Sequence, residues 1–242
     1  MERCEQLWKD GPRYLWDEHC FPPSTDSFLL AAYPSRLKRG AKVCDLGAGA
    51  GLLGVLLLSR ESSLSVVGVE KEEHACAMMQ RNAAENHLNL TAVQGDLRDK
   101  DTLPQRQSFN LVITNPPYFA AGRGAVAQGA RGVERTESTA ALTDILDAAD
   151  FLLRYGGELA IVYKTERLAE LLYEATARKL IPKRLRLVHA HPEAAPSMAL
   201  LMCKKGGHHG LIVEPPLLMK TADGRESDYV KAAYFREKEG TL

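Results

Sequence analysis

Short apolar runs alternate with segments of helical spacing from residue 41 onward. The runs are brief and rich in β-branched residues, which is typical of buried strands, whereas the segments between them repeat apolar residues three and four apart. This pattern predicts strands at 42–46, 65–70, 91–94, 109–114 and 158–163, and helices that end near 58 or span 72–87, 142–153 and 166–179. Repeated strand–helix units predict a parallel sheet covered on both faces, with right-handed crossovers.

The two ends of the chain add to this central pattern. Residues 184–189 and 198–203 are expected to form an antiparallel pair of closing strands. The predicted fold class is therefore α/β, with a doubly wound, mostly parallel, seven-stranded Rossmann-like sheet that carries an antiparallel edge strand. Residues 1–40 are mixed polar and aromatic, and predict an N-terminal arm and lid packed on a single domain of residues 41–242.

Composition and charge restrict the possible functions. Lys plus Arg and Asp plus Glu both number 31 in 242 residues, so the net charge is zero and any RNA site must be a local patch. The five cysteines are scattered without a Cys-x-x-Cys pair, so we expect reduced thiols and no metal site. No apolar stretch is long enough to cross a membrane and the first residues lack a signal-peptide pattern, so we expect a cytoplasmic protein. The sequence does not indicate an oligomeric state.

A glycine-rich turn and three acids mark the ends of successive predicted strands. The turn follows Asp45 and contains Gly47, Gly49 and Gly51, which let the backbone turn sharply and approach a ligand. Glu70 ends the second strand, about 20 residues later, where an acid typically binds ribose hydroxyls. Asp96 follows the third strand. Because parallel strands end at one edge, the three acids are expected to line one crevice.

The position of Asp45 separates two cofactor classes. Dinucleotide binders and methyltransferases share such a glycine turn, but a nicotinamide site holds a diphosphate at the helix start. Asp45 would repel a diphosphate and suits the ammonium and sulfonium charges of S-adenosylmethionine. A nicotinamide-dependent oxidoreductase remains the alternative from another class, although no Tyr-Lys or His hydride site is evident.

The stretch Asn115-Pro116-Pro117-Tyr118 follows the fourth strand directly. Neither proline can donate a ladder hydrogen bond, so the sheet stops and a stiff corner begins. A polar amide and an aromatic ring are thereby held just past the carboxyl end of a strand, where open parallel sheets bind ligands.

Together these motifs resemble class I S-adenosylmethionine-dependent methyltransferases, specifically those that methylate amino groups. Residues 24–30 and 130–134 resemble one branch, the valine-tRNA adenine-N6 methyltransferase family. The resemblance implies that the glycine turn lies under the methionine part of the cofactor, Asp45 holds its amino group, Glu70 its ribose and Asp96 its adenine. It also implies a backbone contact from Leu97 and a place near the pocket mouth for Thr25 and Asp26, although Asp26 serves equally well as a helix cap.

The resemblance implies a role for the proline corner as well. The Asn115 side-chain oxygen and the Pro116 carbonyl would accept hydrogen bonds from the amino group that is methylated. Tyr118 would stack on the base, worth ~1–3 kcal/mol. The expected substrate is an adenosine in a tRNA anticodon loop, because a paired base cannot reach such a pocket. Basic residues late in the chain, with arginines of the loop 120–135, could line a phosphate track.

Other acceptors remain open. Glutamine N5-methyltransferases of proteins use the same Asn-Pro-Pro-Tyr logic, but usually carry a separate helical N-terminal domain, and only about 40 residues precede the first strand here. Adenine in ribosomal RNA or DNA is possible, as is a catalytically idle RNA-binding relative.

Overall fold

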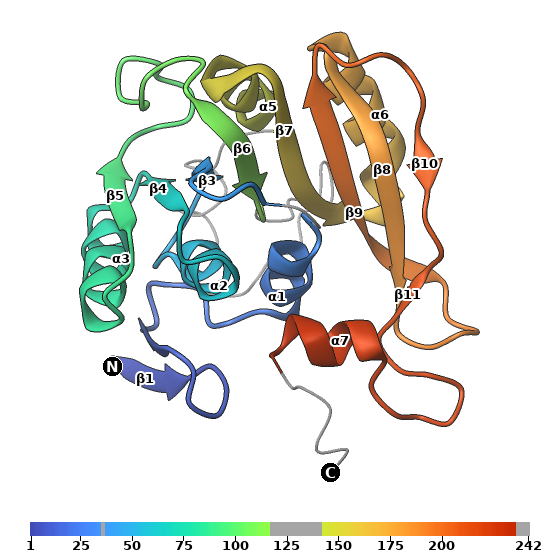
Figure 1. Ribbon diagram of the computed structural model, residues 1–242, viewed down its shortest axis with the longest axis horizontal. Coiled ribbons are helices and arrows are strands. Elements are labelled where there is room, and N and C mark those ends of the chain that lie inside the picture. The colour runs from blue at the N-terminus through green and yellow to red at the C-terminus, as the bar shows by residue number, and fades with distance from the viewer. Residues whose placement is uncertain (35–36, 117–141, 236–242) are drawn as a thin grey trace, which may run out of the picture.

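A nine-stranded sheet forms the centre of the computed structural model, which describes residues 1–34, 37–116 and 142–235 (Figure 1). Its order is β10-β8-β9-β7-β6-β3-β4-β5, with β11 also paired to β8. The strands are β3 (Lys42–Leu46), β4 (Ser65–Glu70), β5 (Leu90–Gln94), β6 (Phe109–Thr114), β7 (Leu153–Lys164), β8 (Leu180–His189), β9 (Pro196–Lys205), β10 (Ile212–Val213) and β11 (Leu217–Leu218).

The sheet runs parallel from β5 to β7, and its order reverses beside β3. Chain connections lead from β3 outward to β4 and β5, then return to β6 on the other side of β3. The strand ends on either side of this reversal leave room for a ligand at their carboxyl edge. The doubly wound, mostly parallel α/β fold predicted from the sequence is confirmed.

The antiparallel strand lies inside the sheet and not at its edge, which corrects the expected arrangement. β9 pairs antiparallel with both β7 and β8, so the predicted antiparallel pair is confirmed while its place differs. The run Ala199–Met202 is buried throughout, because an interior strand is covered on both faces. The strand count also exceeds the expected seven, since the short strands β10 and β11 add in parallel beside β8.

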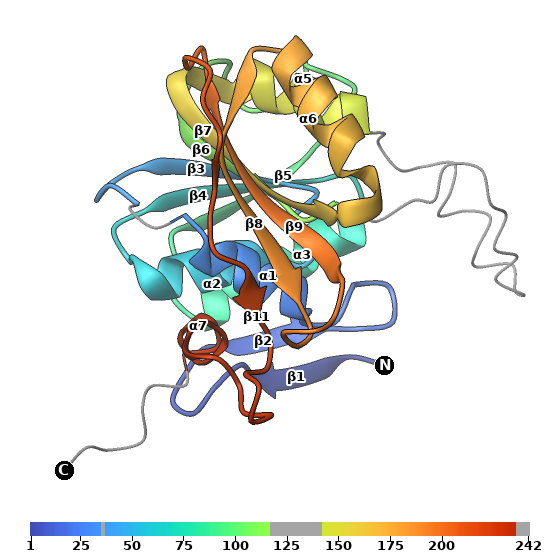
Figure 2. The same cartoon turned by 90° about the vertical axis from the view of Figure 1, so that its right-hand side faces the viewer.

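Helices cover both faces of the sheet, as Figure 2 shows. α1 (Thr25–Ala32), α2 (Leu52–Arg60) and α3 (Glu73–Glu85) lie on one face, and α5 (Leu142–Leu152) and α6 (Leu168–Ala177) on the other. Successive strand residues point to opposite faces, so Val43 joins the first apolar cluster and Cys44 the second. Within the described part of the chain, no helix is long and apolar enough to span a membrane.

The first residues form a hairpin that packs on α3. Its strands are β1 (Arg3–Gln6) and β2 (Arg13–Trp16). The fully buried Asn82 of α3 holds it: its amide oxygen accepts from the Leu15 N–H at 2.7 Å, and its amide nitrogen donates to the carbonyls of Leu15 and Ala50, both at 2.9 Å. The Asn82 side chain thus joins the hairpin to the segment that contains the glycine turn.

A short C-terminal helix, α7 (Asp228–Ala233), lies against α1. Tyr234, which follows it, stacks on Phe28 with ring centroids 4.3 Å apart. Its hydroxyl donates to Thr25 Oγ1 at 2.8 Å. These contacts fix the first turn of α1, which lies beside the end of β6.

Candidate functional site

The predicted acids lie along the carboxyl edge of the parallel strands. Asp45 pairs in register with Gly68 of β4 and Ile113 of β6, so the ends of these three strands lie side by side. Glu70 ends β4, and Asp96 follows β5 by two residues. The strand ends that carry the three acids are therefore neighbours at one edge of the sheet, where parallel sheets bind ligands.

The glycine turn leaves open space on one side. Gly47 and Gly49 have φ angles of 70° and 54°, which favour glycine, and a Cβ at either would meet no atom within 4 Å. Gly51 begins α2 and serves a different purpose, because a Cβ there would lie 2.6 Å from Cγ of Met79. The first two glycines leave room for a ligand, and the third lets α2 approach α3.

Asp45 is a buried acid that has no hydrogen-bond partner among the residues the structure describes. It is 1% exposed, and neither carboxylate oxygen has a hydrogen-bond partner among the described residues. Burial, with the nearby charge of Glu70, raises the pKa of Asp45 to about 8. A buried polar group left unpaired is costly, so this position is suited to receive a cationic group.

Glu70 is held at the junction of the turn and α3. Its Oε2 accepts from the Gly49 N–H at 2.8 Å, and Oε1 accepts from the N–H groups of Lys71 and Glu72 at 2.7 and 3.0 Å. A carboxylate oxygen can accept more than one hydrogen bond, so Glu70 keeps acceptor capacity for ligand hydroxyls.

Asp96 forms ion pairs with Arg98 and Lys71 that were not predicted from the sequence. Arg98 donates to its Oδ1 at 2.9 Å and to its Oδ2 at 2.6 Å, and Lys71 Nζ lies 3.6 Å from Oδ2. The Arg98 guanidinium holds the pKa of the Asp96 carboxyl well below its usual range, so the group is ionised. Leu97 packs, partly buried, against the apolar cluster on the α5 side of the sheet.

Asn115 meets the start of α1. Its amide nitrogen donates to Ser27 Oγ at 3.0 Å and lies 3.5 Å from Ser24 Oγ. Ser24 caps α1, accepting from the Ser27 N–H at 3.3 Å, and the two hydroxyls are 3.0 Å apart. These contacts hold the Asn115 amide against the N-terminus of α1. The sequence did not single out Ser24 and Ser27 as site residues. Ser24 is the residue that caps α1, and Asp26 lies in its first turn.

The remaining predicted residues are placed as follows. Pro116 is buried. The Thr25 hydroxyl accepts from Tyr234, so it faces the C-terminal helix. Tyr118 and the arginines of the loop 120–135 lie outside the described residues.

The basic residues late in the chain do not form one continuous track. Lys204 pairs in register with Glu158 near the start of β7, at the edge opposite to Asn115. Carboxylates pair with several of the described members: Arg178 with Asp147 and Glu174, Arg184 and Arg186 with Glu214, Lys205 with Asp150, and Arg167 with Glu170. An ion pair does not exclude phosphate binding, so the phosphate contacts of these residues stay a prediction. Lys164 and Arg167, at the carboxyl end of β7, stay on the Asn115 side.

Two solved structures with the same fold illustrate the comparison. A predicted O-methyltransferase from Agrobacterium tumefaciens is 21% identical, covers 87% of this chain and 96% of its own, and gives a TM-score of 0.70. The TYW2 protein of P. horikoshii, solved in complex with MeSAdo, is 13% identical, with 83% and 70% coverage and a TM-score of 0.55. The fold of this chain is that of class I S-adenosylmethionine-dependent methyltransferases.

Comparison of the sequence assigns the family. The family model described as methyltransferase small domain matches residues 24–180, and the chain belongs to this family. Curated relatives named tRNA1(Val) (adenine(37)-N6)-methyltransferase include one from Porphyromonas gingivalis, 30% identical over 73% of this chain and 71% of its own. Another, from Shewanella sp., is 32% identical over 64% of this chain and 66% of its own.

The residues present fit S-adenosylmethionine. The unpaired Asp45 carboxylate suits the ammonium group of its methionine part, and the open side of Gly47 and Gly49 leaves space beside it. The acceptor capacity of Glu70 suits ribose hydroxyls.

Proposed function

We propose that this protein methylates the N6 amino group of an adenosine in a tRNA anticodon loop. The position of Asn115 is the observation that carries the proposal: it directly follows β6, at the edge of the sheet where Asp45 and Glu70 lie, and its amide meets the Ser27 hydroxyl at 3.0 Å. The amide oxygen is the atom of this side chain that can accept a hydrogen bond from an amino group. The tRNA part rests on the names of the relatives and on their identity with this chain.

Asn115 and Pro116 polarise the acceptor nitrogen. An amino group conjugated to a purine is a weak nucleophile, because its lone pair is delocalised into the ring. Two carbonyl acceptors on its N–H groups stabilise the positive charge that develops as the nitrogen forms its new bond. The product cation is acidic and loses its proton to solvent, so no strong base is needed. Tyr118 fixes the plane of the base by stacking.

The other site residues bind S-adenosylmethionine and orient it. S-Adenosylmethionine supplies an electrophilic methyl group when bound. Asp45 pairs with its ammonium, Glu70 accepts from the ribose, and Asp96 with the Leu97 backbone contacts the adenine, while Thr25 borders the pocket mouth. Gly47 and Gly49 line the methionine part, and Gly51 sets the approach of α2. Because the reacting atoms must lie in line, much of the rate is expected to come from this positioning.

Ser27→Ala is expected to lower kcat about tenfold. Loss of one hydrogen bond of ~1 kcal/mol or more lets the Asn115 side-chain amide rotate away from its reactive position. KM for tRNA and the affinity for S-adenosylmethionine should change less than about twofold, since Ser27 contacts Asn115 and not the ligands in this proposal. Steady-state kinetics separate the two effects. Ser59→Ala is the matched control, because Ser59 also lies in a helix and its hydroxyl donates to the Val55 carbonyl at 2.8 Å, far from the proposed site. A rise in KM with kcat unchanged would contradict the positioning role.

Binding of S-adenosylmethionine is expected to release about one proton between pH 6 and 7. With a pKa near 8, Asp45 is protonated there in the ligand-free protein, whereas an α-amino group with a pKa of about 7.7–8.0 is charged. Pairing with that ammonium requires the ionised acid, so affinity should rise up to about tenfold per pH unit in this window. Calorimetry in buffers of different ionisation enthalpy measures the release. Asp45→Asn should abolish it, and no release from the wild type would contradict the pairing.

A defined tRNA tests the proposed substrate. An unmodified valine tRNA transcript is incubated with the protein and S-adenosylmethionine, then digested and its nucleosides separated by mass. N6-Methyladenosine is expected, and it should vanish when guanosine replaces the adenosine that follows the anticodon. Equal methylation of both transcripts would place the target elsewhere, and methylation of neither would contradict the tRNA proposal.

A further inference from the structure

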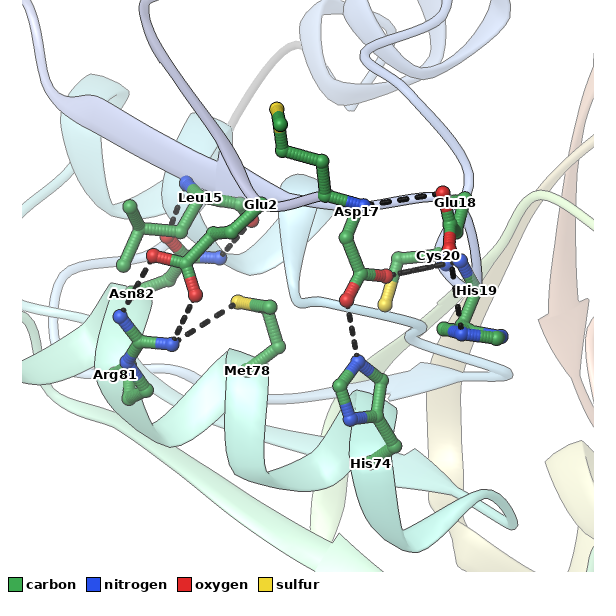
Figure 3. A network of polar contacts seen from close by, with 11 residues as sticks. Glu2, Leu15, Asp17, Glu18, His19, Cys20, His74, Met78, Arg81 and Asn82 are labelled. Atoms are coloured by element: carbon green, nitrogen blue, oxygen red, sulfur yellow. Dashed lines mark hydrogen bonds and ion pairs between the residues drawn. The ribbon is translucent and has the colours of Figure 1, made fainter.

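Three metal-binding side chains of different types meet where the N-terminal arm contacts α3 (Figure 3). They are Asp17 and Cys20, in the turn after β2, and His74, in the first turn of α3. One ligand atom of each lies within 4.8 Å of the other two. The cluster is separate from the groups assigned to methyl transfer.

The arm presents two of these ligands from one locked turn. Asp17 Oδ1 accepts from the N–H groups of His19 and Cys20, at 2.9 and 3.2 Å, and the Cys20 N–H also donates to the Asp17 carbonyl at 3.2 Å. These bonds fix the carboxylate and leave Oδ2 to face α3. Asp17 and Cys20 are each only 7% exposed, so the turn is held by its surroundings as well.

The third ligand lies on the accessible side. His74 Nε2 is 2.7 Å from Asp17 Oδ2, and the His74 side chain is 53% exposed. An ion entering from solvent would therefore reach the carboxylate from the side of His74, whose exposed ring can move aside. Figure 3 shows the His74 ring and the Cys20 sulfur on the same side of the Asp17 carboxylate.

We propose that Asp17, Cys20 and His74 form a zinc-binding site. Oxygen, nitrogen and sulfur ligands in one small cluster are the donor set of Zn²⁺, which binds them at about 2.0–2.3 Å in tetrahedral geometry. Such a geometry places ligand atoms about 3.3–3.7 Å apart, so the cluster reaches it by shifts of about 1 Å or less per side chain. The thiol gives up its proton to solvent on binding, and water takes the fourth position on the exposed side.

The contact between Asp17 and His74 could be a structural ion pair, but such a pair does not require a buried thiol beside it, and Cys20 provides one. A metal at this location would also affect the end of β4. The helix α3 begins three residues after Glu70, and the Cys76 thiol donates to the Glu70 carbonyl at 3.3 Å. Zinc would thus fasten the arm to the segment that ends β4. The expectation of no metal site rested on cysteine spacing, which cannot detect a cluster whose histidine lies far along the chain.

Metal titration of the full chain tests the site without using methyl transfer. Chelator-treated protein is titrated with Zn²⁺ by calorimetry and with Co²⁺ by absorption. We expect one ion per chain and a thiolate-to-cobalt charge-transfer band. Loss of even an outer contact costs about 10- to 100-fold in metal affinity, so Cys20→Ala and His74→Gln should each weaken zinc at least about 100-fold. Cys20→Ala should also remove the cobalt band.

Two controls address adventitious binding. Cys4→Ser removes an exposed thiol of the same arm, and a variant with glutamine at both His208 and His209 removes an exposed histidine pair. Both should bind zinc within about twofold of the wild type. Thermal unfolding without metal checks that each variant is folded. The site is overturned if the wild type binds no zinc, if folded Cys20→Ala or His74→Gln binds it normally, or if either control loses it.

Discussion

Replacing Asn115 by alanine is expected to reduce methyl transfer by at least about 100-fold, while the affinity for S-adenosylmethionine stays within a few-fold. The amide oxygen acts where positive charge develops, so its loss affects the transition state far more than the bound ground state. Its removal also leaves Ser27, which is 6% exposed, without the donor it meets in the structure. Single-turnover methyl transfer and calorimetry measure the two quantities.

Asn110→Ala is the matched control for this prediction. Asn110 lies on the same strand, but its oxygen accepts from the Lys42 N–H at 2.9 Å, near the start of β3 and away from the site. Its loss should leave kcat within about threefold, as is usual for an exposed hydrogen bond worth ~1 kcal/mol or less. If Asn115→Ala weakens cofactor binding as strongly as it slows transfer, the acceptor role is wrong.

Asp45→Asn is expected to change binding and stability in opposite directions. Truncating one partner of a buried charge pair costs about 2–5 kcal/mol, so S-adenosylmethionine should bind about 30- to 5,000-fold more weakly. The ligand-free protein should become more stable, because the pKa of Asp45 is raised to about 8 and the folded chain resists its ionisation. The gain should be small near pH 5 and complete above about pH 8.

Calorimetry measures the loss of affinity for S-adenosylmethionine, and denaturant unfolding at two pH values measures the gain in stability of the ligand-free protein. Asp99→Asn serves as a control, because Asp99 is an exposed acid in the loop after β5. Asp45→Asn that destabilises the ligand-free protein at pH 8 would show that the carboxylate has a structural partner. Unchanged affinity for the cofactor would remove Asp45 from the binding site.

Much of the fold was predictable because local patterns determine it. The run 109–114 reads as a buried strand from its apolar residues alone, and β6 has these bounds. Asp45, Glu70 and Asp96 could be assigned to one edge because parallel strands end together. The place of β9 was not predictable, because an apolar run specifies a covered strand and not its neighbours. The division of the chain at residue 40 and the roles of the site residues stay predictions.

The site details that were missed depend on contacts between distant segments. Arg98 could not be assigned to Asp96 without the turn that brings them together, although they are close in sequence. Ser27 and Asn115 lie 88 residues apart, and their contact depends on how α1 meets β6. The spread of the basic residues over both edges of the sheet was not predictable, because sequence proximity does not reveal that β7 and β9 run in opposite directions.

The direct test of the central proposal is the destination of the methyl group. Methyl-labelled S-adenosylmethionine is offered with total tRNA, ribosomal RNA, DNA and protein in separate reactions, and labelled products are digested and identified. We predict label in tRNA, recovered as N6-methyladenosine, with little in the other three acceptors. Label in protein alone, recovered as N5-methylglutamine, would contradict the proposed substrate. Asn115 would then accept hydrogen bonds from the amide of a glutamine side chain and not from the amino group of a base.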